Sequence, residues 1–337
     1  MSDPERSLTW AHGTLAVQRL GAMLAPVEFR LHDGRTVTPL HVAPWAGEPG
    51  SEELPGILKR LRGEWPCVPF GYSVPADGWP GEWAGHLGPP ADDEEVHGRS
   101  SNHDWDWLAD DGTALRLRLD YPAASPVAYV EREVRPDPQA AAVDLTFRIT
   151  VKRRCRLPIG LHPVFRLPAE AGAARLDVGT FRLGRTYPAT VEPGKAVFAA
   201  DRQFTDLAAV PARDGGSPID ATALPLGLDA EELLQIEGSE GHARLVNLAE
   251  GYRVMLTWNV AHFPSLLLWM SNRGRTAFPW NGRHLAIGIE PICSPFGLGP
   301  ATATADNPIA RSGVATALDF TPDAPFETHY RLSAEAL

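Results

Sequence analysis

The amino-acid sequence predicts an all-β protein, a large antiparallel β-sandwich with few short helices. Apolar residues recur at every second position in many segments, which is typical of strands that bury one face and expose the other. Clusters of turn-forming residues such as ADDG, ARDGG and SNRGR separate these segments. Helical spacing of apolar residues is rare. We therefore expect two antiparallel sheets packed face to face.

Three segments show the two-residue period most clearly. They are LRLRLDY at 115–121, VDLTFRITVK at 143–152 and YRVMLTW at 252–258. In each of them apolar side chains occupy one face and mainly polar side chains occupy the other. We expect each segment to form a half-buried antiparallel strand.

One segment has helical spacing. In SEELPGILKRL, residues 51–61, apolar residues fall at positions i, i+3, i+4 and i+7, and Ser51 stands where an N-cap would. Pro55 interrupts the segment, so the sequence predicts only a short helix there.

Length and composition predict one soluble globular domain over residues 1–337. The chain has 44% hydrophobic and 22% charged residues, and no internal repeat or low-complexity linker divides it. The net charge of −11 argues against nucleic acid or an anionic membrane as the main partner. MSDPERSLTW lacks the apolar core of a secretory signal, and no apolar run reaches membrane-spanning length. Three widely spaced cysteines, Cys67, Cys155 and Cys293, fit reduced thiols, so we expect a cytoplasmic protein.

An acid interrupts the apolar strand HLAIGIEPICSPFG, residues 284–297. This acid is Glu290, and its face of the strand otherwise carries the small residues Ala286 and Gly288. Pro291 is expected to end the strand directly after it. A carboxylate on a face cleared of bulk predicts a site with space beside it. The alternative is a glutamate that is solvated or paired with a nearby arginine: Arg273, Arg275 or Arg283.

Three further polar residues stand in apolar or glycine-rich surroundings. They are His162 in LPIGLHPVFRLP, His97 in EEVHGRSSNHDWDW and Arg62 in LRGEWPCVPFG. Taken singly, a histidine among apolar residues is more often a hydrogen-bonded core residue than a catalyst. The combination of these segments is more informative.

Together the segments resemble the aldose 1-epimerases (galactose mutarotase-like proteins), including their hexose-6-phosphate mutarotase branch. GLHPVFRLP is similar to the family's His-Pro-Tyr-Phe element, with Val164 where tyrosine is usual, and LAIGIEPICSP to its closing Glu-Pro strand. LRGEWPCVPFG is similar to the branch's Arg-Gly-Gly-x-Pro segment, with Glu64 replacing the second glycine. VHGRSSNHDW is similar to its His-Gly-Phe-Ala-Arg segment followed by tryptophan. The four elements occur in the family order between residues 61 and 297, and the resemblance implies a β-supersandwich fold.

The resemblance also implies an activity and the residues that perform it. Interconversion of α- and β-anomers removes the proton of the anomeric hydroxyl and protonates the ring oxygen, so the site needs a base and an acid. Glu290 would be the base and His162 the acid, and we expect each to favour the charged form of the other. His97 would donate to the sugar, and Arg62 would position hydroxyls or an anionic group. The expected partner is a monosaccharide, and the reaction needs neither a metal nor an organic cofactor.

Two substrate-binding groups are less well defined by the sequence. The family binds sugar hydroxyls with an acid from its middle region, where this chain offers three aspartates without a distinguishing motif: Asp206, Asp214 and Asp220. Trp269, in SLLLWMSN, offers a stacking face for a sugar, although a core tryptophan is an equal alternative.

The arginines bear on whether the sugar is phosphorylated. The phosphate branch has an arginine four residues after its His-Gly histidine, where this chain has Ser101, while Arg99 lies two residues after His97. A phosphate needs two or more converging cations to replace its hydration. We therefore expect a free aldose to be the better substrate. The alternative is that Arg99 has shifted in its loop and binds a phosphate together with Arg62.

Three other interpretations remain open from the sequence. The chain could be a non-catalytic carbohydrate-binding or regulatory protein on the same fold. It could be a metal-dependent β-sandwich enzyme with ligands from HGRSSNHDWD, namely His97, His103, Asp104 and Asp106. It could also use Cys293, three residues after Glu290, as a nucleophile.

Overall fold

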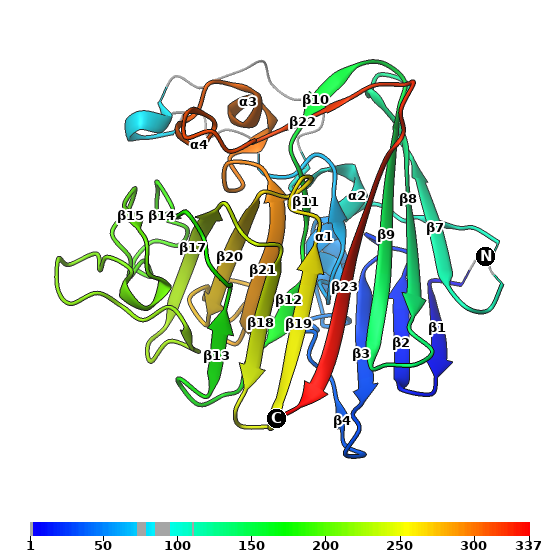
Figure 1. Cartoon of the computed structure of the whole chain (residues 1–337), viewed down its shortest axis with the longest axis horizontal. Coiled ribbons are helices and arrows are strands. Elements are labelled where there is room, and N and C mark those ends of the chain that lie inside the picture. The colour runs from blue at the N-terminus through cyan, green and yellow to red at the C-terminus, as the bar shows by residue number, and fades with distance from the viewer. Residues whose placement is uncertain (1–2, 73–78, 85–94, 110) are drawn as a thin grey trace.

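The computed structural model of the chain describes residues 3–72, 79–84, 95–109 and 111–337, and it shows two large antiparallel sheets (Figure 1). Within these residues the α-helices are short: α1 (Gly56–Lys59), α2 (Gly98–Asn102), α3 (Gly299–Thr304) and α4 (Pro308–Arg311). No helix in this part of the chain is long and apolar enough to cross a membrane. The predicted all-β sandwich with few short helices is confirmed.

The larger sheet has nine strands, and the three segments with the clearest two-residue period lie in it as β7, β9 and β19. In β9 every second side chain is buried in the core, and the alternate side chains face outward. The strands follow one another across the sheet in the order β16 (Ala223–Leu224), β13 (Ala174–Asp177), β18 (His242–Asn247), β19 (Tyr252–Trp258), β23 (Phe326–Ala336), β9 (Ala142–Val151), β8 (Val127–Pro136), β7 (Leu115–Asp120) and β6 (Asp106–Trp107).

The second large sheet has eight strands and is covered on both faces. Its order is β15 (Gln203–Phe204), β14 (Leu183–Thr186), β17 (Ala230–Glu237), β20 (Ser265–Asn272), β21 (Leu285–Cys293), β11 (Ile159–Leu161) and β5 (Pro66–Cys67), with β12 (Val164–Arg166) also paired to β21. Every residue of β17 and β20 is buried. Alternate residues of β17, β20 and β21, such as Leu234, Leu268 and Ile289, pack in the core between the two sheets. The residues between them, such as Leu233, Leu267 and Trp269, pack in a separate apolar cluster on the other face.

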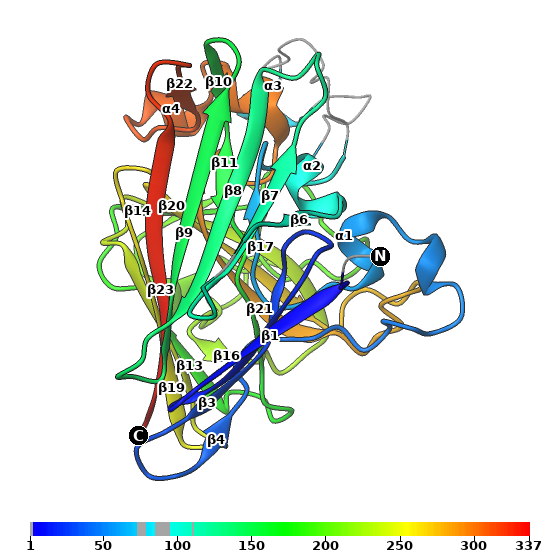
Figure 2. The ribbon, with the colours of Figure 1, turned by 90° about the vertical axis from the view of Figure 1, so that its right-hand side faces the viewer.

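Two smaller sheets complete the fold (Figure 2). One contains β1 (Glu5–Trp10), β2 (Gly13–Gln18), β3 (Leu24–Arg30) and β4 (Thr36–Val37), and the other pairs β10 (Cys155–Leu157) with β22 (Leu318–Phe320). The core between the large sheets includes residues from β2 and β3, so it draws on the chain from Leu15 to Ala334. Single 3-10 turns occur at Ser51–Glu53, Gly81–Trp83 and Leu207–Ala209.

The helix predicted at 51–61 is shorter than its apolar spacing indicates. Pro55 separates a 3-10 turn from α1, which agrees with the prediction that this proline interrupts the segment. Ser51 does not act as an N-cap, because Gly50 precedes the turn and the Ser51 hydroxyl is buried without a hydrogen-bond partner among the described residues.

The prediction that Pro291 ends its strand is wrong, because β21 continues to Cys293. β21 pairs with β12 through residues 286–288 and with β11 through residues 292–293. Pro291 lies between these two pairings, opposite His162 and Pro163, where the regular ladder is interrupted although the Pro163 carbonyl still accepts from the Ile289 N–H at 2.9 Å. A residue without a backbone N–H is tolerated at such an interruption of the ladder.

Candidate active site

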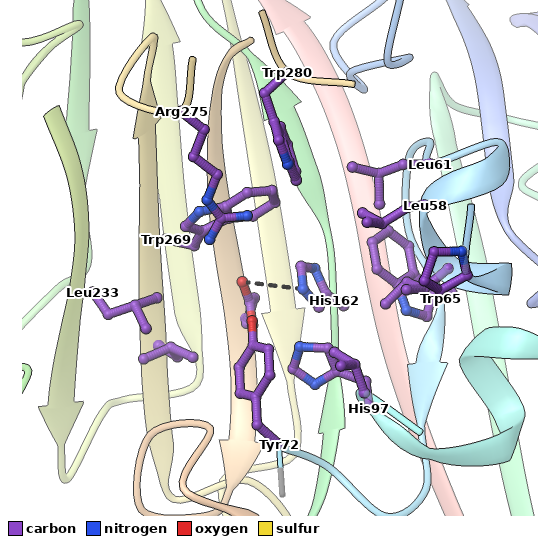
Figure 3. Close-up of a pocket in the computed structure, with 15 residues that line it drawn as sticks. Leu58, Leu61, Trp65, Tyr72, His97, His162, Leu233, Trp269, Arg275 and Trp280 are labelled. Atoms are coloured by element: carbon purple, nitrogen blue, oxygen red, sulfur yellow. Dashed lines mark ion pairs between the residues drawn. The ribbon is translucent and has the colours of Figure 1, made fainter. Parts of the chain in front are cut away.

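A cavity of about 180 Å³ lies within the apolar cluster on the second face of the eight-stranded sheet (Figure 3). Four of the six predicted site residues line it: Glu290, His162, His97 and Trp269. Pockets for drug-sized ligands usually measure about 300–1,000 Å³, so a cavity of this size suits one small molecule.

Glu290 projects from β21 into this cavity, and its residue is only 1% exposed. The small residue two positions earlier provides the space for its carboxylate. A Cβ atom at Gly288 would lie 2.3 Å from Glu290 Oε1 and 3.0 Å from Trp269 Cβ. The small neighbours predicted space beside the acid, and in the structure Gly288 accommodates the carboxylate itself.

His162 lies opposite Glu290, in the short link between β11 and β12. Its ring stacks on Trp65 with centroids 4.2 Å apart, and its backbone N–H donates to the Trp65 carbonyl at 2.8 Å. Trp65 thus supplies aromatic packing, although the family's usual tyrosine is Val164 here. The Nε2 atom of His162 lies 3.5 Å from Glu290 Oε1. His162 Nδ1 and Glu290 Oε2 are both buried without a hydrogen-bond partner among the described residues.

Burial dominates the electrostatics of this pair. Desolvation raises the pKa of Glu290 well above 4.5, because the charged carboxylate loses its hydration. Desolvation also lowers the pKa of His162 well below 6.5, and the neighbouring His97 lowers it further. Burial thus disfavours the charged form of each residue, which opposes the expected mutual stabilisation of the two charges. A carboxylic acid beside a neutral imidazole and a carboxylate beside an imidazolium both place one proton on the pair.

His97 lies against the pair, with its ring edge-on to His162 at 5.1 Å between centroids. It adopts a left-handed conformation at φ 57° just before α2. Its Nδ1 atom accepts a hydrogen bond from the Gly71 N–H at 3.3 Å, so the neutral ring carries its proton on Nε2. Burial lowers the pKa of His97 to about 3. In this state the side chain can donate one hydrogen bond into the cavity.

The two predicted arginines do not line the cavity, which corrects their assignment. Arg62 extends to Glu5 of β1, with Nη1 2.9 Å from Oε2. Its segment lies tightly against β3, where a Cβ atom on Gly63 would come within 1.7 Å of the Leu24 carbonyl oxygen. This packing directs Arg62 toward the N-terminal sheet.

Arg99 lies on α2 and donates from Nε to the Asp120 carbonyl at 3.1 Å. The expectation that it shares a face with His97 assumed an extended chain. Since a helix begins at Gly98, residues two apart point in different directions.

Arg275 is a cavity residue that the sequence analysis considered only as a possible partner of Glu290. It instead pairs with Glu231 of β17, with Nε 3.1 Å from Oε1. The Arg275 guanidinium lies over Trp280 at 4.6 Å and near Trp269 at 5.7 Å, distances at which cations and aromatic rings attract. Trp269 donates its indole N–H to the same Glu231 oxygen at 2.7 Å. Glu231 thus holds both a cation and an aromatic ring at the cavity wall.

Glu231 lies next to the cavity and contacts its lining residues Trp269 and Arg275, whereas the three aspartates do not line the cavity. Asp206 accepts from the Ala208 N–H, and Asp214 and Asp220 accept from the N–H groups two residues later, as is usual in turns. An acid in the apolar strand AEELLQIE is the same signal that identified Glu290, and it could have drawn attention to Glu231. Burial raises the pKa of Glu231, and Arg275 opposes that rise.

Glu64, which replaces a family glycine, is buried in an ion pair with Arg132 of β8. Its other oxygen accepts from the Tyr330 hydroxyl of β23 at 2.7 Å. Arg132 also donates from Nη1 to the Glu64 carbonyl at 3.1 Å. This network attaches the segment that carries Trp65 to the nine-stranded sheet.

The proposed metal ligands point to different partners. His97 faces the cavity, His103 lies 2.9 Å from Glu95, and Arg19 pairs with both Asp104 and Asp106. In the described part of the chain no group of three His, Cys, Asp or Glu side chains could hold a metal ion.

The proposed nucleophile is also unsuited to its role. Cys293 packs on the opposite face of β21 from Glu290, in the core between the sheets. Burial raises the pKa of its thiol to about 12, so the reactive thiolate is disfavoured.

Comparison with known proteins identifies the fold by structure alone, since neither a protein-family model nor a curated protein matches the sequence. A putative aldose 1-epimerase from Escherichia coli K12 matches with a TM-score of 0.65 at 17% identity, covering 99% of both chains. A galactose mutarotase related enzyme from Lactobacillus acidophilus matches at 0.63 and 13% identity over 98% of this chain and 97% of the other. A GalM/aldose epimerase homologue from C. elegans matches at 0.63 and 13% identity over 99% of both. The chain therefore has the fold of the aldose 1-epimerases and galactose mutarotase-like proteins.

Proposed function

We propose that the protein is an aldose 1-epimerase-like enzyme, a mutarotase, with Glu290 as the base and His162 as the acid. The observation that carries this proposal is the pair itself, two proton-transfer groups 3.5 Å apart in a buried cavity of monosaccharide size. Anomer interconversion requires two such groups. A protein that only binds a sugar does not.

The reaction opens and recloses the sugar ring. Glu290 takes the proton of the anomeric hydroxyl, the bond between C1 and the ring oxygen breaks, and its electron pair goes to the ring oxygen, which takes a proton from His162. The open aldehyde rotates about its C1–C2 bond. Closure onto the other face of the carbonyl reverses both proton transfers and regenerates the pair.

Substrate binding supports the charged state that this reaction starts from. The anomeric hydroxyl donates to Glu290 and so favours its carboxylate, while the ring oxygen accepts from His162 and so favours its imidazolium. A proton that burial favours on Glu290 then resides on His162. Since the pair holds one proton in both states, no proton has to enter or leave the cavity.

Other cavity groups suit the remaining parts of a sugar. His97 offers an N–H donor at Nε2, and Arg275 offers guanidinium donors at a fixed position. Trp269 and Trp280 add aromatic rings to the cavity lining. Sugars combine hydroxyl groups with apolar C–H faces, and such a mixed lining binds both.

The charges favour a free aldose over a sugar phosphate. Arg62 pairs with Glu5, and Arg99 is held on α2. Arg275 is the one arginine among the described lining residues, and Glu231 already neutralises it. A phosphate dianion would therefore find too few free cations to replace its hydration. Comparison of glucose and galactose with glucose 6-phosphate tests this preference directly, and a higher catalytic efficiency for the phosphate would refute it.

Polarimetry of freshly dissolved α-anomers tests the activity, because mutarotation changes optical rotation. We expect Glu290→Gln and His162→Asn each to lower kcat by about two to four orders of magnitude. Glu232→Gln is a matched control, since Glu232 is also a buried glutamate but its carboxylate accepts from the backbone of Val197 and Phe198. A folded Glu290→Gln protein with the wild-type rate would exclude Glu290 as the base. Sugar binding without mutarotation by the wild-type protein would instead indicate the non-catalytic carbohydrate-binding alternative.

A further inference from the structure

Tyr72 is a cavity residue that has no role in the reaction described so far. It lines the cavity together with Glu290, His162 and His97. Its ring lies edge-on to His97 with centroids 5.1 Å apart, and His97 lies at the same distance from His162. In Figure 3 the Tyr72 ring extends toward the dashed line that joins His162 to Glu290, with its hydroxyl oxygen at the near end. The phenol therefore points at the proton-transfer pair.

The segment that follows β21 fixes the position of Tyr72. The Tyr72 N–H donates to the Gly297 carbonyl at 2.8 Å. A Cβ atom on Gly297 would lie 2.8 Å from the nearest carbon of the Tyr72 ring, and a Cβ atom on Gly299 would lie 2.0 Å from the Tyr72 carbonyl oxygen. Only glycines permit this close contact. Since β21 also carries Glu290, one continuous part of the chain positions both the phenol and the carboxylate.

His97 holds the residue before Tyr72 from the other side. Its backbone N–H donates to the Gly71 carbonyl at 2.7 Å, and its Nδ1 atom accepts from the Gly71 N–H at 3.3 Å. A tyrosine that is fixed in this way loses little further freedom when a ligand binds. A hydrogen bond from its hydroxyl to a ligand is therefore preorganised.

The Tyr72 hydroxyl forms no hydrogen bond with another described residue, unlike other tyrosine hydroxyls of the interior. Tyr121 donates to the Val68 carbonyl at 2.7 Å, and Tyr330 donates to Glu64 at 2.7 Å. These two hydroxyls complete structural contacts. Tyr72 lines the cavity and is 36% exposed, so a ligand in the cavity can reach it.

The phenol is available as a hydrogen-bond donor. Partial desolvation raises the pKa of Tyr72 above 10, Arg275 opposes this rise, and Glu290 adds to it. At neutral pH the hydroxyl therefore keeps its proton and can donate it to an acceptor.

The acceptor follows from the role of Glu290, and this step rests on the proposed function. If Glu290 takes the proton of the anomeric hydroxyl, then the anomeric oxygen O1 lies within hydrogen-bond distance of its carboxylate. A donor that points at the pair then points at O1. Negative charge develops on O1 as its proton leaves, and a fixed donor stabilises such charge most in the transition state.

We propose that the Tyr72 hydroxyl donates a hydrogen bond to the anomeric oxygen of the sugar and stabilises the charge that forms there while the ring opens. The same contact polarises the aldehyde for ring closure, because O1 is the carbonyl oxygen of the open form. Tyr72 keeps its proton throughout, so the proton transfers of Glu290 and His162 are unchanged.

Tyr72→Phe removes the hydroxyl and keeps the ring. We expect this variant to lower kcat for mutarotation by about ten- to a hundredfold and to change KM less, since the hydrogen bond strengthens in the transition state. Tyr187→Phe is the matched control, because Tyr187 packs against Phe296 in the same apolar cluster and does not line the cavity. An unchanged kcat in Tyr72→Phe, or equal losses in both variants, would overturn the proposal while leaving the mutarotase activity in place.

Two sugar analogues identify the oxygen that Tyr72 contacts. 1,5-Anhydro-D-glucitol lacks O1, and 2-deoxy-D-glucose lacks the hydroxyl on the neighbouring carbon; the galactose analogues serve if galactose is the better substrate. Quenching of tryptophan fluorescence should show equal affinity of the wild type and Tyr72→Phe for the anhydro sugar, and polarimetry should show that the loss of kcat persists with the 2-deoxy sugar. Weaker binding of the anhydro sugar by the variant, or no loss of kcat with the 2-deoxy sugar, would assign Tyr72 to another hydroxyl and overturn the proposal.

The binding measurements also separate this contact from the proposed function. A wild-type protein that bound glucose without mutarotation would refute the proposed function. A severalfold lower affinity of Tyr72→Phe for glucose, with unchanged affinity for 1,5-anhydro-D-glucitol, would still support the contact with O1 in that case.

Discussion

Substitution of Gly288 by alanine tests whether the position of the Glu290 carboxylate limits catalysis. The added Cβ atom would lie 2.3 Å from Glu290 Oε1, where ordinary contact begins at 3.4 Å. The oxygen would therefore have to recede by about 1.1 Å. A misplacement of about 1 Å can cost about a hundredfold in rate. Since the carboxylate is the mobile end of a side chain, we expect it to move while the strand remains in place.

The assay separates catalysis from folding and binding. We expect Gly288→Ala to lower kcat for mutarotation by about a hundredfold and to change KM less, because the added Cβ would lie closer to the carboxylate, at 2.3 Å, than to Trp269 Cβ, at 3.0 Å. The pH dependence of kcat should shift as well, since a displaced carboxylate has a different distance to His162. Thermal unfolding should remain cooperative, with a midpoint close to that of the wild type.

A second glycine provides the control for an added methyl group. A Cβ atom on Gly184 of β14 would lie 2.2 Å from the ring of Phe204, in the same sheet but away from the cavity. Gly184→Ala should affect stability without changing the pH profile of the activity. If Gly288→Ala kept the wild-type kcat, or if both variants changed kcat alike, the carboxylate would not need the space that Gly288 provides.

Three further predictions concern buried charges. Burial raises the pKa of Glu290 above 4.5 and lowers that of His162 below 6.5, so the pair should keep its one proton on both sides of neutral pH. A bell-shaped pH profile of kcat confined between pH 4.5 and 6.5 would contradict this. Arg132→Met should cost about 3–5 kcal/mol of unfolding free energy by leaving Glu64 buried without its cation, and Glu64→Gln in the same protein should restore part of it, as denaturant titration can measure. Burial raises the pKa of Glu232 from 4.5 to about 7, so its contribution to stability is complete below pH 4.5 and is lost as the pH rises through 7. Relative to Glu232→Gln, the wild type should lose about 3 kcal/mol across that range, and parallel stability curves for the two proteins would refute the assignment.

The two-residue period was a reliable guide to the fold because it reflects burial directly. In β7, β9 and β19 one face meets the core and the other meets water, so the sequence alternates. The period is less informative for β17 and β20, whose residues are buried on both faces. There, the two faces differ in what they pack against, which composition does not reveal.

The candidate site was partly predictable for a similar reason. Glu290 lies in a strand and His162 lies beside a proline, and such surroundings restrict where a side chain can point. Both residues therefore line the cavity, as their motifs predicted. Arg62 and Arg99 did not, because their directions depend on contacts far away in the sequence, with Glu5 and with the carbonyl of Asp120. A long side chain in a loop or a short helix can point either into a cavity or toward a neighbouring part of the fold. A sequence motif does not tell which of these two directions it takes.

Buried glutamates are frequent in this protein, and their partners distinguish a structural acid from a reactive one. Glu64 pairs with Arg132, Glu231 with Arg275, and Glu237 with Arg182 and Arg185, so each of these carboxylates has donors within the protein. Glu290 Oε2 is buried and has no donor among the described residues. Leaving such an atom unpaired costs about 1–3 kcal/mol of stability. Glu290 lines the cavity, and under the proposed function a sugar hydroxyl would supply the donor that its carboxylate lacks.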